Sequence, residues 1–248
     1  VALDQASPID ERDFILKPED KVMQFNARAF GQKVYAFMSL KKFKERFQEL
    51  VQRLKIKQPE VYFGVSYRAL EYFLKKNRIW EEFIQIILNS ELSYPARSEQ
   101  IRKLILSQPL PADLKEILLE AHRSNVGDRK SQVRSSAIRE HKMHNFAPSR
   151  TAANEAEFLE SVQHIWGHFF VENMARHMAK NIEGMSGEDS FRLIKYFPSL
   201  MVQEFVDGEI AVNMVTMNPA TGNYKQIAMN AVKGSSNSLS TGKLDGDR

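Results

Sequence analysis

The C-terminal part of the sequence alternates short apolar segments with turn signals, and this pattern constrains the fold more than any other feature. An apolar segment over residues 200–206 runs into an Asp-Gly dipeptide typical of hairpin turns, and a second β-prone segment follows over 209–216. Another turn over 218–223 precedes a third such segment over 226–232. Connections this short join antiparallel strands. The pattern therefore predicts an antiparallel meander.

The first half of the chain has the periodicity of amphipathic helices. Apolar residues recur three and four positions apart over 37–54, and Ser66 is a suitable N-cap for a helix that includes Leu74. Pro111 suits the first turn of a helix that runs to His122. We expect helices over residues 34–56, 66–74, 79–92, 101–108, 112–122 and 154–180, a break over 94–98, and strands before residue 65 and from residue 133.

Helices followed by an antiparallel sheet indicate an α+β fold with helices flanking the sheet. The 248 residues suffice for one large or two small domains. We expect a polar, proline-containing leading arm over residues 1–25 and a helix-rich N-terminal subdomain over 26–123. A strand-rich subdomain, incomplete at its C-terminus, is expected over 124–248.

Composition narrows the function classes. The chain has 35 basic and 31 acidic residues, a net charge of +4 that falls short of the concentrated basic face of a nucleic-acid-binding protein. It has no cysteine, so disulfides and thiolate metal sites are excluded. No apolar run approaches the ~20 residues that span a bilayer, and the first residues do not resemble a signal peptide. We therefore expect a cytoplasmic protein that binds neither nucleic acid nor membrane.

One pentapeptide suggests an anion site. Residues 133–137 (VRSSA) place Arg134 between a β-branched residue and two hydroxyl residues, Ser135 and Ser136, after a polar loop that contains Gly127. A guanidinium beside hydroxyl donors suits a phosphate or a carboxylate. Such a run is also common in solvated loops, so the pentapeptide gains its meaning from the segments around it.

Two histidines, His164 and His168, are four residues apart on one expected helix. This spacing can hold a metal ion, but the glutamate of the H-E-x-x-H motif is absent and no third ligand is evident. We therefore predict a packed or hydrogen-bonded histidine pair and no metal site.

The order of several segments resembles a known family. Residues 101–121 (IRKLILSQPLPADLKEILLEA) precede VRSSA, and residues 155–170 (EAEFLESVQHIWGHFF) and 200–208 (LMVQEFVDG) follow it. This order is similar to the N-terminal nucleotide-binding region of the phosphoenolpyruvate synthase and pyruvate phosphate dikinase family, in divergent and truncated form. The resemblance covers roughly residues 26–246 and implies an ATP-grasp-like fold.

The resemblance also implies the residues of an ATP site. Lys33, in a Gly-Gln-Lys segment, and Arg134 would balance the charge of the triphosphate. The hinge that reads adenine would be the segment containing Gln203, Glu204 and Val206, and Glu209 would bind the ribose hydroxyls. The catalytic residues themselves are not identified by the resemblance.

The expected phosphate loop departs most from the family pattern. Residues 138–153 correspond to a mobile loop that normally carries glycine after its Phe-Ala dipeptide, but here Pro148 follows Phe146 and Ala147. Proline has no N–H with which to bind a phosphate oxygen. The loss of this donor puts catalysis in question more than it does the fold.

In the family, the corresponding region takes part in ATP-dependent phosphoryl transfer to a histidine on a separate domain. The ligands of Mg²⁺, the phosphohistidine domain and the acceptor-binding domain are expected outside this chain, as further parts of a longer protein. The sequence thus predicts a fragment of a dikinase-type phosphotransferase. One alternative is a non-catalytic nucleotide-binding or regulatory module without the phosphate loop. Another is a helical protein-interaction domain without a ligand.

Overall fold

The chain divides into two compact units, residues 1–205 and 206–248, and each is described by itself. The computed structural model describes residues 14–17, 31, 33–34, 36, 44–55, 59–137, 149–182 and 196–234. Within these residues, none of the helices combines the length and the apolar character that crossing a membrane requires.

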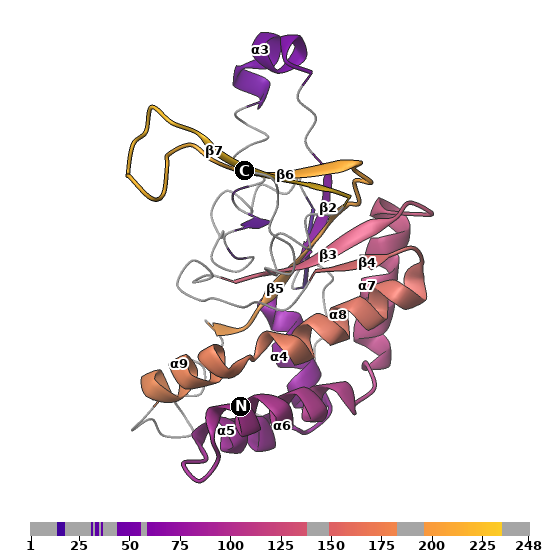
Figure 1. Cartoon of the computed structure of the whole chain (residues 1–248). Helices are drawn as coiled ribbons and strands as arrows, with labels where there is room; N and C mark the ends of the chain where they lie inside the picture. Colours follow the sequence, from indigo (N-terminus) through magenta and orange to yellow (C-terminus); the bar gives the residue numbers. More distant parts are fainter. Residues whose placement is uncertain are drawn as a thin grey trace. The chain divides into compact units, whose positions relative to one another are not determined.

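The first unit contains a five-stranded sheet and several helices (Figure 1). The described strands are β1 (Ile15–Leu16), β2 (Val61–Val65), β3 (Ser131–Ser136), β4 (Arg150–Ala152) and β5 (Ser199–Glu204). The described helices are α3 (Gln48–Arg53), α4 (Tyr67–Lys76), α5 (Trp80–Leu88), α6 (Tyr94–Leu106), α7 (Ala112–Asn125), α8 (Glu155–Phe169) and α9 (Glu172–Ile182). The predicted α+β class is confirmed.

The strand order is β1-β2-β5-β3-β4, and each neighbouring pair is antiparallel. β5 is therefore the central strand, between β2 and β3. All three side chains of Leu200–Val202 are fully buried. The backbone N–H and C=O groups of such a segment have no water to bond, so they need partner strands on both edges.

This arrangement corrects the predicted meander. In the second unit, β6 (Ile210–Val215) and β7 (Ala228–Lys233) pair with each other in a two-stranded sheet. β5 belongs to the sheet of the first unit instead, although an Asp-Gly turn signal separates it from β6. Local turn chemistry predicted the β6–β7 pair correctly, but burial decided the partners of β5.

Two helical layers cover one face of the sheet (Figure 1). α4, α7 and α8 contact strands, and α5 and α6 pack outside them, with α6 against α8 and α9. On this face Phe63 of β2 meets Phe158 of α8 edge to face, with ring centroids 5.9 Å apart. Farther from the sheet, Phe83, Phe170 and Phe197 form a mutually packed aromatic cluster. The core therefore lies between the sheet and the helices.

Side-chain caps fix the starts of α4 and α8. The Ser66 hydroxyl accepts a hydrogen bond from the N–H of Arg68, which confirms the predicted cap of α4. Asn154 caps α8 by accepting from the N–H of Glu157, and the Glu157 carboxylate accepts in return from the N–H of Ala153.

Other helix boundaries differ from the prediction. α5 ends at Leu88, and α6 begins at Tyr94, within the expected break, because Ser93 caps it and accepts from the N–H of Ala96. The helix expected over 154–180 is interrupted after Phe169. Phe170, the C-cap of α8, leaves helical geometry with ψ 55°, and both it and Phe169 are buried. Most of the helix expected over 34–56 lies outside the described residues.

Candidate functional site

A distant segment docks on the C-terminal end of β3. The Lys33 Nζ donates a hydrogen bond to the backbone oxygen of Ser135 over 3.0 Å, and the N–H of Val34 donates to the Ser136 hydroxyl over 3.3 Å. Gly31 has φ +72°, and a Cβ built on it would lie 2.2 Å from the Ser136 carbonyl oxygen. Only glycine fits this contact. The structure therefore brings Lys33 to the residue that follows Arg134.

Strand alternation separates the residues of β3 onto two faces. Val133 and Ser135 are paired with Val202 and Leu200, on the face that the helices cover. Arg134 is paired with Met201, and its side chain is on the opposite face.

This alternation corrects the idea that both serine hydroxyls flank the guanidinium. Ser135 is turned to the helical face, and its hydroxyl is buried there without a hydrogen-bond partner among the described residues. Ser136 is on the face of Arg134, but its hydroxyl already accepts from Val34. Arg134 is therefore the charged donor that β3 presents on this face, and its guanidinium has no partner among the described residues.

The face of Arg134 is polar along two strands. Gln132 and Arg134 of β3 share it with Gln203 of β5, because Gln132 is directly paired with Gln203. Arg134 is half-buried, and its side chain takes part in none of the hydrogen bonds or ion pairs found among the described residues. Gln203 is 7% exposed, and its Oε1 is buried with no hydrogen-bond partner in the described part of the chain. Both side chains have unused hydrogen-bonding capacity.

Glu204 lies at the end of β5, where the first unit ends. Its N–H donates to the Glu60 carbonyl oxygen over 2.7 Å, and its carboxylate accepts from the Glu60 N–H over 3.1 Å. The N–H of Phe205 donates to the Lys130 carbonyl oxygen. The last residues of the first unit are thus tied to the strands on both sides.

An arginine supports the same end of the sheet. Arg129 donates to the carbonyl oxygens of Val126 and Asn125, and its guanidinium lies 4.5 Å from the ring centroid of Tyr62. Burial raises the pKa of Tyr62; Glu60 and Glu204 add to this effect, and Arg129 opposes it. Sequence reasoning did not identify Tyr62 or Arg129, because neither belongs to a recognisable motif.

The predicted residues fall into both units. Lys33, Arg134, Gln203 and Glu204 belong to the first unit, and Val206 and Glu209 belong to the second, where both side chains are exposed. The carbonyl oxygen of Glu209 accepts from the N–H of Gly234. Residues 138–148, with the proline of the expected phosphate loop, lie outside the described residues.

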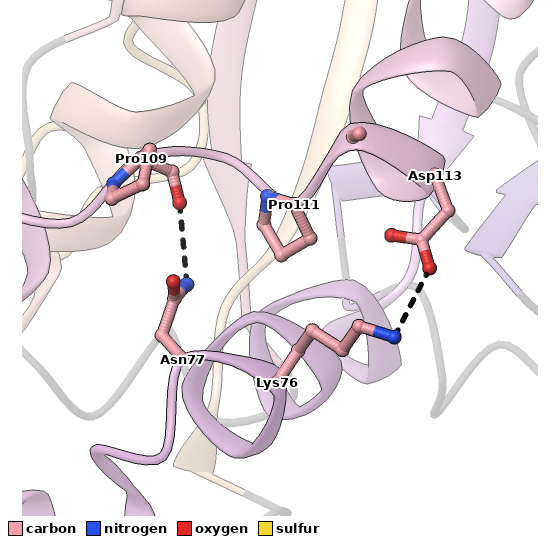
Figure 2. Close-up of a pocket in the computed structure, with 6 residues that line it drawn as sticks. Lys76, Asn77, Pro109, Pro111 and Asp113 are labelled. Carbon is pink, nitrogen blue, oxygen red and sulfur yellow. Dashed lines mark hydrogen bonds and ion pairs between the residues drawn. The ribbon is translucent and has the colours of Figure 1, made fainter.

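A surface pocket of ≈ 360 Å³ lies at the junction of α4 and α7 (Figure 2). Asn77 donates to the Pro109 carbonyl oxygen on one side, and Lys76 pairs with Asp113 over 3.5 Å on the other. The pocket is lined by Lys76, Asn77, Pro109, Pro111, Ala112 and Asp113. It includes none of the residues predicted to bind the nucleotide.

Asp113 at this pocket also accepts a hydrogen bond from the Tyr72 hydroxyl over 2.5 Å. Burial, reinforced by this carboxylate, raises the pKa of Tyr72. For Asp113, burial favours a higher pKa, but the hydrogen bonds from Tyr72 and Leu114 and the charge of Lys76 outweigh it, so the pKa is lowered. The aspartate is thus ionised and fully engaged, which makes its role structural.

The histidine pair on α8 is stacked, as predicted for a packed pair. The ring centroids of His164 and His168 are 3.8 Å apart. Burial, with the charges of His168, Arg150 and Arg102, lowers the pKa of His164 to about 4. The His164 ring is therefore uncharged at neutral pH.

Comparison with known proteins defines the class of this module. A helix-covered antiparallel sheet with a lysine and an arginine at one strand end is consistent with an α+β, ATP-grasp-like nucleotide-binding domain. Residues 38–248 match the family of the pyruvate phosphate dikinase AMP/ATP-binding domain. The chain belongs to this family.

A curated relative is consistent with this assignment. The chain is 23% identical over 202 residues to a protein of Methanocaldococcus jannaschii described as a probable phosphoenolpyruvate synthase. The match covers 75% of this chain and 16% of the relative. The chain thus corresponds to a small part of that protein.

Proposed function

We propose that this chain binds ATP, with its phosphates at Arg134 and Lys33. The observation that carries the proposal is the guanidinium of Arg134, which has no partner among the described residues and lies beside the residue on which Lys33 docks. A half-buried guanidinium without a counter-ion is unfavourable, and a phosphate offers it forked, charge-assisted hydrogen bonds. Lys33 would add a second positive charge.

Gln203 suits the adenine end of ATP. Its buried Oε1 lacks a donor among the described residues, and the exocyclic amino group of adenine is a donor. The N–H of Glu204 is not available to the base, because it already donates to the Glu60 carbonyl oxygen. The groups in the first unit therefore suit both ends of a nucleotide.

The reaction that this site would serve is phosphoryl transfer from ATP toward a histidine on another domain. Bound Mg²⁺ would neutralise part of the phosphate charge. Its ligands, the phosphohistidine domain and the acceptor-binding domain would be supplied by other parts of a longer protein. The family and the relative described as a probable phosphoenolpyruvate synthase support this assignment. Within this chain, Arg134, Lys33 and Gln203 would bind and orient the nucleotide.

A second candidate is a nucleotide-binding module that regulates without catalysis. It is favoured by Pro148, which removes a backbone donor from the expected phosphate loop. Binding would persist in this case, because Arg134 and Lys33 do not belong to that loop.

Isothermal titration calorimetry with ATP tests the binding proposal. Loss of the charge-assisted hydrogen bonds of Arg134 should cost about 1.5–3 kcal/mol, so Arg134→Ala should weaken binding about 10- to 100-fold. Arg78→Ala is the matched control, because Arg78 is an exposed arginine in the loop between α4 and α5. Equal ATP affinity in wild type and Arg134→Ala would end the assignment at this site.

Turnover distinguishes the two candidates. A full-length protein that contains this chain should release AMP or ADP from ATP if it is a phosphotransferase. A full-length protein that binds ATP without releasing either product would leave the regulatory module as the function.

A further inference from the structure

Basic side chains gather on the helix-covered face of the sheet, away from the proposed ATP site. Arg150 of β4 is paired with Val133 of β3, and paired residues share a face, so the Arg150 side chain lies on the side of the buried Val133. Arg134 is on the opposite face. α8, which carries His164 and His168, packs against β4. Arg150 is therefore near the histidines and apart from Arg134.

A close approach of α6 to α8 adds a second arginine, Arg102. A Cβ built on Gly167 of α8 would lie 3.6 Å from the Arg102 carbonyl oxygen. Gln163 of α8 also donates a hydrogen bond to the Ile105 carbonyl oxygen over 3.0 Å. Since Gln163 and Gly167 flank His164 on α8, these contacts hold the part of α6 that contains Arg102 beside His164.

The charges around His164 are mainly positive. Burial is the largest cause of its low pKa of about 4, and the charges of the second histidine, of Arg150 and of Arg102 lower it as well. Neighbouring carboxylates do not offset these charges. Glu99 forms an ion pair with Arg102, and Glu160, one turn before His164 on α8, is exposed and forms no ion pair among the described residues. The cluster therefore favours an anion.

Arg150 has unused capacity to bind such an anion. It is half-buried, and it has neither an ion pair nor a side-chain hydrogen bond among the described residues. A half-buried guanidinium without a counter-ion is unfavourable, and a tetrahedral oxyanion offers it forked, charge-assisted hydrogen bonds. The guanidinium of Arg102 has further N–H donors besides the one that bonds Glu99. Both arginines thus have donors for an oxyanion.

The stacked histidines couple this cluster to pH. The ring centroids of His164 and His168 are 3.8 Å apart, and two protonated rings at this separation repel each other. An anion beside the rings reduces that repulsion. Glu172, one turn after His168, does not supply this charge, because it pairs with Arg176. Anion binding and protonation of the histidines should therefore favour each other.

We propose that Arg150 and Arg102 bind a phosphate group beside the two histidines, either as inorganic phosphate or as a phosphate monoester. The guanidiniums supply the hydrogen bonds. The histidines make binding tighter as the pH falls, at constant charge of the anion, because the bound anion favours their protonated form. The site is independent of the proposed ATP site, because Arg150 and Arg134 are on opposite faces of the sheet.

Nuclear magnetic resonance titration of the full chain with sodium sulfate tests the site. Sulfate is tetrahedral, and its charge stays constant near neutral pH, so changes with pH report on the protein. At pH 6.0 the ring signals of His164 and His168 should shift saturably. Arg150→Gln should weaken sulfate binding about tenfold or more, because it removes charge-assisted hydrogen bonds. Arg78→Gln, in the loop between α4 and α5, is the matched control and should bind like the wild type.

The pKa of His164 supplies a second readout, which a merely structural role of Arg150 would not change. Saturating sulfate should raise this pKa from about 4 by about 1 or more, and sodium chloride of equal ionic strength should raise it less. In Arg150→Gln the pKa should be higher before sulfate is added, because a positive charge is gone. Sulfate should then change it little.

Two further ligands distinguish the forms of the phosphate group. Tighter binding of inorganic phosphate than of glycerol 3-phosphate at pH 7.5 would support a site for the free anion, and the reverse order would support a site for a monoester. Histidine shifts that sodium chloride reproduces would overturn the proposal. Equal sulfate affinity in wild type and Arg150→Gln, or loss of the histidine shifts in Arg134→Ala, would also overturn it.

Discussion

The Lys33 Nζ donates a hydrogen bond to the backbone oxygen of Ser135 over 3.0 Å, and the two residues are 102 positions apart in the sequence. The contact carries a lysine from the N-terminal part of the chain to the residue next to Arg134. Because Arg134 is a half-buried cation without a partner among the described residues, two positive charges gather at the end of β3.

Gly31→Ala should detach the segment that carries Lys33. The new Cβ would lie 2.2 Å from the Ser136 carbonyl oxygen, at a φ of +72°. We expect the overpacking to lower the free energy of unfolding by about 1–3 kcal/mol beyond the backbone cost, and ATP affinity to fall as Lys33 leaves Ser135. Urea unfolding and ATP titration measure the two effects.

The control for this substitution is Gly127→Ala. Gly127 also has a positive φ, of +60°, but the nearest atom to its added Cβ is 4.0 Å away. It should show only the backbone cost of about 1–2 kcal/mol and unchanged ATP affinity. The role of Gly31 would be wrong if both variants lost the same stability and bound ATP equally well.

Gln203→Met should weaken ATP binding without lowering the free energy of unfolding. The buried Oε1 of Gln203 has no hydrogen-bond partner among the described residues, and an unsatisfied buried acceptor costs about 1–3 kcal/mol. Methionine has a similar length and no such acceptor. The free energy of unfolding without ligand should be unchanged or higher, and ATP should bind about tenfold more weakly. A lower free energy of unfolding with unchanged ATP affinity would show that Gln203 is only a packing residue.

His122→Phe should reduce the sensitivity of the fold to acid. His122 is 1% exposed, both of its ring nitrogens lack a hydrogen-bond partner among the described residues, and its ring lies 4.8 Å from that of Phe158. Burial lowers the pKa of His122, and Glu155 opposes this only in part. Below about pH 6.5 the unfolded chain therefore binds a proton that the folded chain does not, so stability falls as pH decreases.

Urea unfolding at pH 7.5 and 5.5 measures this effect. Phenylalanine has no nitrogens to leave unpaired, so the variant should be at least as stable as the wild type at pH 7.5. Its advantage should grow by at most about 1.4 kcal/mol at pH 5.5. An advantage that shrinks on acidification would mean that His122 gains a partner when it is protonated.

Local sequence signals predicted much of the fold. Ser66 identified the start of α4, and Pro111 identified the start of α7, because capping and proline geometry act within one turn. The interruption between Phe169 and Val171 has no proline or glycine to mark it. It follows from the tertiary contacts of Phe170, whose ring packs against Phe83 at 5.1 Å. Sequence periodicity does not contain that information.

In the candidate site too, some residues could be predicted from the sequence and others depend on tertiary contacts. The VRSSA pentapeptide pointed to Arg134, because a guanidinium beside hydroxyl donors suits an anion, and the family resemblance pointed to Lys33 through its Gly-Gln-Lys segment. Strand alternation should have placed Ser135 on the opposite face from Arg134, since neighbouring residues of a strand alternate. Tyr62 and Arg129 could not have been found, because their contact depends on the pairing of β2 with β5 and on the loop after α7.

The most direct test of the account is a double-mutant cycle on Arg134 and Lys33, with ATP and adenosine as ligands in calorimetric titrations. If both cations bind the same phosphates, each alanine variant should weaken ATP binding about tenfold or more. The effects in the double variant should then depart from additivity by about 0.5–3 kcal/mol, and adenosine affinity should not change. Unchanged ATP affinity in Arg134→Ala, or equal losses for ATP and adenosine, would contradict the account.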